Sequence, residues 1–159
     1  METRGRYIWA VLRIAMGWTF LWPFLDKLFG LGFSTAPEKS WLAGGSPTTG
    51  FLKSAVGPFS NLYKSIAGSP IVDWLFMLGL LALGVALILG IGMRLASVGG
   101  VLMMLLMWSS HLPPTTNPFL DQHLIYALVL IGLAVTKAGD TLGLGKWWAK
   151  LVNNSPVLQ

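Results

Sequence analysis

Long apolar runs with few charges dominate the chain. The first covers residues 7–29 and is long enough to cross a bilayer as a helix, because about 20 residues at 1.5 Å each span a hydrocarbon core of roughly 30 Å. Its charged residues are Arg13 and the adjacent Asp26 and Lys27. A charge inside such a span costs roughly 3 kcal/mol unless it is paired or hydrated. We therefore expect the later segments to pack around this helix and to supply Arg13 with partners.

Three more apolar runs follow the first. Residues 71–91 and 93–110 are joined by a very short turn, which predicts an antiparallel helical hairpin. Ala82, Ala86 and Gly90 recur every fourth residue, a small-residue stripe that favours close approach of another helix. The last run, residues 124–135, must extend to about 119–138 to cross a bilayer. The pattern predicts an all-α fold, an integral membrane four-helix bundle in one domain over residues 1–159.

The long connection between the first two runs has a pattern of its own. Over residues 46–67, apolar residues recur at helical spacing and polar residues occupy the opposite side. Ser46 is a candidate N-cap with Pro47 as the first helical residue. Gly57 and Pro58 should break or kink the helix midway. We expect an amphipathic interfacial helix, or two short ones, in this loop.

Composition and charge support the membrane interpretation. The chain is 54% hydrophobic and 11% charged, whereas about 25% of an average soluble domain is charged. The net charge of +5 then reflects topology, and we expect no nucleic-acid partner. The basic residues that flank the runs place both termini, with the tail 139–159, on the cytoplasmic side of the cell membrane: Arg4, Arg6, Arg94, Lys137, Lys146 and Lys150. A cleaved signal peptide is the alternative interpretation of the first run, but the length of the run and the presence of Arg13 within it disfavour a signal peptide.

Candidate chemistry gathers at the outer ends of the runs. His111 closes the third run and His123 opens the fourth, while Asp26 and Asp121 map to the same level. Histidine near a carboxylate can exchange protons with a quinone near neutral pH, so these four residues are the catalytic candidates. An aromatic belt with polar caps is the alternative interpretation. The residues that could contact a bound quinone are Arg13, Trp22, Lys27, Trp41, Trp74, Trp108 and Tyr126.

Other kinds of site receive less support. Arg13 either extends to the cytoplasmic headgroups or is a buried cation that holds a carbonyl, a quinone oxygen or a helix end. His111 and His123 are two possible haem ligands, but haem ligands in helical bundles usually lie deeper, so we expect no haem. The ligands for a metal site are too few, and the chain has no cysteine. Outer lysines could attract a small anion.

Several segments resemble one family over nearly the whole chain. Arg13 in the first run and DKLFG at residues 26–30 are similar to the DoxX/DoxD superfamily of four-helix membrane proteins. WLAGGSPTTGFL at residues 41–52 and NPFLDQHLIYA at residues 117–127 resemble the DoxD branch in particular. So does the glycine-rich segment at residues 78–96.

The resemblance implies a membrane subunit of quinone-linked redox enzymes. DoxD is the small subunit of thiosulfate:quinone oxidoreductase, which oxidises thiosulfate, a small sulfur oxyanion, to tetrathionate and passes electrons to quinone. It acts with a separate DoxA subunit, and this sequence has no DoxA-like segment, so we expect a partner. Whether the chain is itself an enzyme stays open. The alternative is a non-catalytic accessory subunit of a larger respiratory or photosynthetic membrane complex; a small transporter is a weaker third possibility.

Overall fold

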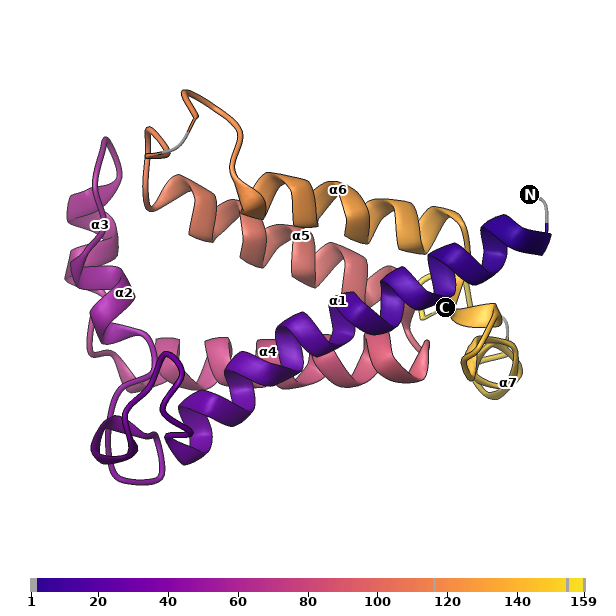
Figure 1. The fold of residues 1–159 in the computed structure, drawn as a ribbon, viewed down its shortest axis with the longest axis horizontal. Helices are drawn as coiled ribbons and strands as arrows, with labels where there is room; N and C mark the ends of the chain where they lie inside the picture. Colours follow the sequence, from indigo (N-terminus) through magenta and orange to yellow (C-terminus); the bar gives the residue numbers. More distant parts are fainter. Residues whose placement is uncertain (1–2, 116, 154, 159) are drawn as a thin grey trace.

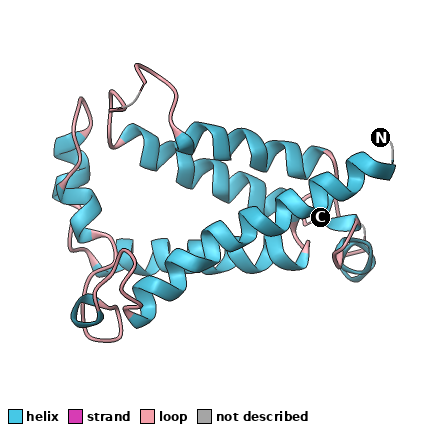
Figure 2. Ribbon diagram, in the orientation of Figure 1, coloured by secondary structure: helices cyan, strands magenta, loops and turns pink. Residues whose placement is uncertain are grey.

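The computed structural model describes residues 3–115, 117–153 and 155–158, and this part of the chain is helical without a β-strand. Figure 2 shows helices joined by loops and turns. The α-helices are α1 (Thr3–Phe29), α2 (Thr49–Lys53), α3 (Ser60–Ser65), α4 (Pro70–Leu89), α5 (Met93–Ser109), α6 (Gln122–Val135) and α7 (Gly145–Leu151). Two 3₁₀ turns, η1 (Pro37–Lys39) and η2 (Ala138–Asp140), lie in the connections. The all-α class predicted from the sequence is therefore confirmed.

The four long helices form two pairs. Helix α1 packs along α4, and α5 packs along α6, while the α4–α5 turn joins the two pairs (Figure 1). A shared core of buried apolar side chains lies between the pairs: Met16, Phe20, Leu80, Leu83, Leu87, Met93, Ala96, Met104, Ala127, Leu130, Leu133 and Ala138. By length and composition, α1 and α4 can each cross a membrane, whereas α5 and α6 are shorter apolar helices of 17 and 14 residues. Four complete crossings stay a prediction.

Two glycines bring α1 and α4 into close contact. A Cβ on Gly84 would lie 2.9 Å from backbone atoms of Leu21, and a Cβ on Gly17 would lie 2.9 Å from the backbone nitrogen of Ile88. The predicted stripe is divided, because Ala82 and Ala86 line a groove between α4 and α5, whereas Gly90 lies against Arg13 of α1. Gly84 is therefore the residue of α4 that permits the approach of α1.

Large apolar side chains cover the outside of every long helix. Ile8 is 68% exposed, Leu75 67%, Val98 70% and Leu128 63%. They lie on α1, α4, α5 and α6 respectively. Exposed apolar surface of this extent in water would mark an interaction site or favour aggregation. Lipid is the solvent that suits such a surface.

The connections agree with the expectations in the two short helices and differ at the helix starts. The loop between α1 and α4 holds two short helices, α2 and α3, on either side of Gly57 (φ 83°). Helix α2 begins at Thr49, so Pro47 is not its first residue, although the Thr49 N–H donates to Ser46 Oγ at 3.1 Å. Helix α6 begins at Gln122 instead of residue 119, because the Asp121 side chain caps it. The tail contains η2 and α7.

Candidate functional site

The predicted histidines and aspartates occupy the end of the molecule where α1 finishes, α4 begins and a loop joins α5 to α6 (Figure 1). We call this the loop end and define it by residues 22–74 and 106–126. The opposite end carries α7 and the α4–α5 turn (Figure 1). We call it the basic end and define it by Arg6, Arg94, Lys137, Lys146 and Lys150.

Asp121 and His123 form a hydrogen-bonded pair at the start of α6. Asp121 Oδ1 accepts the backbone N–H groups of His123 and Leu124 at 2.9 and 3.2 Å, which caps the helix. Its Oδ2 lies 2.6 Å from His123 Nδ1, and the side chains are 18% and 15% exposed. A carboxylate at Nδ1 favours the proton on that nitrogen and leaves Nε2 to exchange protons. Among the described residues, Nε2 has no hydrogen-bond partner.

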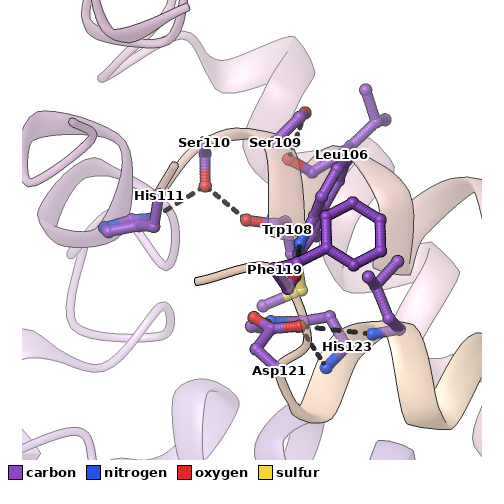
Figure 3. A network of polar contacts seen from close by, with 10 residues as sticks. Leu106, Trp108, Ser109, Ser110, His111, Phe119, Asp121 and His123 are labelled. Carbon is purple, nitrogen blue, oxygen red and sulfur yellow. Dashed lines mark hydrogen bonds and ion pairs between the residues drawn. The ribbon is translucent and has the colours of Figure 1, made fainter. Parts of the chain in front are cut away.

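Aromatic side chains lie next to this pair. The rings of Trp108 and Phe119 meet edge to face with centroids 5.6 Å apart, and Trp108 Nε1–H donates to the Phe119 carbonyl at 3.0 Å. Figure 3 shows both rings beside Asp121 and His123. Tyr126, in the second turn of α6, packs against the apolar core. The Asp121–His123 pair therefore lies at an apolar, aromatic boundary.

His111 belongs to a different cluster. Its Nε2 lies 3.1 Å from Ser54 Oγ and its Nδ1 lies 2.8 Å from Ser110 Oγ, so both ring nitrogens have partners. The Phe51 ring packs on the imidazole with centroids 4.7 Å apart. In Figure 3, His111 points away from Asp121 and His123. The structure does not bring the two histidines together, and His111 instead ties α2 to the end of α5.

Asp26 holds the loop that follows α1. It is 1% exposed and accepts the N–H groups of Phe33 and Ser34 at 3.1 and 3.0 Å and the Ser34 hydroxyl at 2.7 Å. The Trp22 and Phe33 rings meet edge to face beside it, 4.9 Å apart. Asp26 therefore binds the loop that follows its own helix and lies apart from the Asp121–His123 pair at the start of α6. Its neighbour Lys27 is half-buried.

Asp73 plays a similar role at the start of α4. Its Oδ1 accepts the Ser46 hydroxyl at 2.9 Å, the Thr48 N–H at 3.2 Å and the Thr48 hydroxyl. Trp41 and Trp74 pack edge to face nearby, with centroids 4.6 Å apart. Sequence reasoning did not select Asp73, because nothing local to it indicates partners 25 and 27 residues earlier.

Arg13 lies away from the loop end and is fully buried. Its guanidinium donates to the carbonyls of Leu87 and Ile88 at the C-terminus of α4. It also donates to Thr141 and Leu142, at 3.4 and 2.7 Å. The headgroup interpretation of Arg13 is therefore wrong, and the helix-end alternative describes what the structure shows. A cation at a helix C-terminus also interacts favourably with the helix dipole.

Comparison with known proteins identifies the family. The DoxX family model matches residues 8–112, about two thirds of the chain. The chain belongs to the DoxX family. No curated protein and no solved structure matches it. Family membership, two helices apolar enough to span and the apolar exterior indicate an integral membrane protein in contact with lipid.

The cavities of this DoxX-family protein add a feature that sequence reasoning missed. The basic end holds one cavity of about 440 Å³, lined in part by Arg94, Lys137, Lys146 and Lys150, and a second of about 220 Å³ that includes Arg6. The histidines and aspartates predicted as catalytic do not line either of them. From the sequence, these cations indicated only how the chain is oriented in the membrane. The sequence did not show that they converge, because their convergence depends on the turn at residues 136–144.

Proposed function

We propose that this DoxX-family protein is a membrane subunit of a quinone-linked oxidoreductase, with the Asp121–His123 pair exchanging protons with the quinone. The observation that carries the proposal is the 2.6 Å contact between Asp121 Oδ2 and His123 Nδ1 beside an aromatic pair. In this proposal the four long helices cross the cell membrane. The loop end faces outward, and both termini are cytoplasmic.

The chemistry of quinone reduction matches this pair. A quinone takes up two electrons and two protons to become a quinol. His123 can donate a proton from Nε2, and Asp121 stabilises the imidazolium before transfer. The faces of Trp108 and Phe119 suit an apolar ring, and the Trp22, Trp41 and Trp74 rings extend the aromatic surface of the loop end.

The DoxD-like segments favour thiosulfate as the electron donor. Two thiosulfate ions form one tetrathionate and release two electrons, which reduce one quinone. That reaction needs a second subunit, of the DoxA type or within a larger membrane complex. In this arrangement the present chain supplies the quinone site and the proton relay.

A non-catalytic accessory subunit is the second candidate. It is favoured by the way the loop end uses its polar groups: Asp26, Asp73 and His111 each have hydrogen-bond partners within that end. Groups held in this way stabilise loops, which is what a scaffold requires. The exposed apolar helix faces suit contact with other membrane subunits as well as with lipid.

One set of variants separates the two candidates. In the complex isolated from membranes, His123→Gln and Asp121→Asn should lower thiosulfate-dependent reduction of a soluble quinone analogue by about 10²-fold or more, the usual contribution of a positioned acid–base group. Asn at position 121 keeps an oxygen that can cap α6, so folding should survive. The rate of quinone reduction and the amount of assembled complex are both measured.

Tyr63→Phe is the matched control. The Tyr63 hydroxyl contacts the Leu106 carbonyl and Ser109 Oγ at the same end, at 3.0 and 2.6 Å, without a proposed role in proton exchange. It should leave the rate unchanged. Full turnover in His123→Gln, with normal assembly, would reject the proton relay and support the accessory role.

A further inference from the structure

The cavity at the basic end has the charge of an anion site. Arg94, Lys137, Lys146 and Lys150 line it together with one carboxylate, Asp140. All four cations are exposed, and within the described part of the chain none of them is in a salt bridge. Arg94 does donate one bond, from Nη1 to the Pro156 carbonyl at 2.7 Å. Four cations against one carboxylate leave the cavity strongly positive.

An apolar groove adjoins this cavity. It has a volume of about 340 Å³ and lies between α4 and α5, with Trp148 of α7 lining both spaces. Six of the residues that line it are small, from the two helices and the turn between them: Gly79, Ala82, Ala86, Gly92, Ala96 and Gly99. The cavity and the groove meet at the α4–α5 turn, since Gly90 and Met93 line the first and Ile91 and Gly92 the second.

We propose that this end binds one anionic phospholipid, with its phosphate headgroup in the basic cavity and an acyl chain in the groove. Basic pockets at membrane helix ends recognise acidic headgroups, and guanidinium groups match phosphate oxygens in a bidentate manner. A free phosphate ion would use the cavity alone. The groove makes the lipid the better occupant, because its small side chains leave room for a hydrocarbon chain that points away from the charges.

The experiment measures lipid binding to the full-length protein. Native mass spectrometry of the detergent-solubilised protein is combined with thermal unfolding in the presence of phosphatidylglycerol, phosphatidylcholine or inorganic phosphate. Phosphatidylglycerol should stay bound and raise the Tm, whereas phosphatidylcholine and phosphate should have little effect. Dihexanoyl phosphatidylglycerol tests the need for a long chain in the unaltered protein.

Two variants test the two halves of the site. The double variant Lys146→Gln/Lys150→Gln should bind phosphatidylglycerol about 25-fold more weakly, about fivefold for each lysine near the surface. The matched control is Lys53→Gln/Lys64→Gln at the loop end, which removes the same charge and should change the affinity less than twofold. Gly99→Leu is chosen to narrow the groove, because Gly99 lines it and a Cβ there meets nothing within 4 Å. It should weaken binding of long-chain lipid several-fold.

Three outcomes would overturn the proposal. Equal weakening by both double variants would mean that net charge alone attracts the lipid. If inorganic phosphate raised the Tm as much as the lipid does, the cavity would be a site for a free anion. Equal affinity for dihexanoyl and long-chain phosphatidylglycerol would remove the groove from the site, even if Gly99→Leu did not fold. None of these results bears on quinone reduction at the loop end.

Discussion

Replacing Arg13 by Leu tests whether one buried cation holds the basic end together. Arg13 is fully buried, and three acceptors, the carbonyls of Leu87, Ile88 and Leu142, lie within 3.0 Å of its guanidinium nitrogens. The carbonyls of Leu87 and Ile88 lie in the last turn of α4, and the carbonyl of Leu142 belongs to the turn that precedes α7. Leucine can fill part of the space but cannot donate. The variant should therefore leave these carbonyls without the Arg13 donor and weaken the link between the turn and α4, which would still be held by the bond from the Leu144 N–H to the Leu89 carbonyl at 2.8 Å.

The cost follows from those bonds. Hydrogen bonds to charged groups contribute about 1.5–3 kcal/mol each, so the three short ones give roughly 4.5–9 kcal/mol. Water that reaches this end, and relief from burying the guanidinium, offset part of this sum. With these offsets, and at about 1–3 kcal/mol for each buried carbonyl left without a donor, we expect a net loss of about 3–5 kcal/mol. At about 2–4 °C per kcal/mol, the Tm should fall by about 10 °C.

The assay is unfolding in mixed detergent micelles, followed by circular dichroism. Arg13→Lys should recover about half of the loss, because a single ammonium keeps the charge but cannot reach both groups of carbonyls. Arg4→Gln is the control on the same helix; Arg4 is exposed, and its replacement should cost less than about 0.5 kcal/mol. An Arg13→Leu variant as stable as the unaltered protein would refute the reasoning.

Two further predictions use the same assay. Gly84→Ala should destabilise by about 1–3 kcal/mol, because its Cβ would lie 2.9 Å from the Leu21 backbone, whereas Gly99→Ala meets nothing within 4 Å and should be neutral. Asp73→Ala should cost about 2–3 kcal/mol by leaving the Thr48 N–H and hydroxyl without their acceptor, and Asp73→Asn should cost about half as much. Equal losses for the paired variants would contradict either prediction.

Periodicity sufficed to predict the class of this fold but not the ends of its helices. The apolar runs correspond to α1, α4, α5 and α6, because the helical spacing of apolar residues can be recognised within each segment of the sequence alone. The ends depend on single side chains. Asp121 starts α6 by accepting two backbone N–H groups, and the length needed to cross a bilayer gave no information about that cap.

Long-range contacts explain why the predicted site was only partly informative. The sequence spacing of Asp121 and His123 already permits their contact, since they are two residues apart at a helix start. The partners of Arg13 lie 74 to 129 residues away, so periodicity could indicate a buried cation but could not name what it binds. His111 shows the same limit, because its partner Ser54 comes from the other helix pair's connecting loop.

The two ends of the molecule use their charged residues differently, and this contrast indicates which kind of ligand each end suits. At the loop end, Asp26, Asp73 and Asp121 all accept bonds from nearby backbone or side chains, so His123 Nε2 is the protonable atom best placed for chemistry. At the basic end the surface cations have no carboxylate partner among the described residues, whereas Arg13 is buried against backbone carbonyls. A soluble anion could leave such a surface at once, but a lipid retained by an apolar groove would persist. The basic end therefore fits a resident lipid, and the loop end fits an exchangeable substrate.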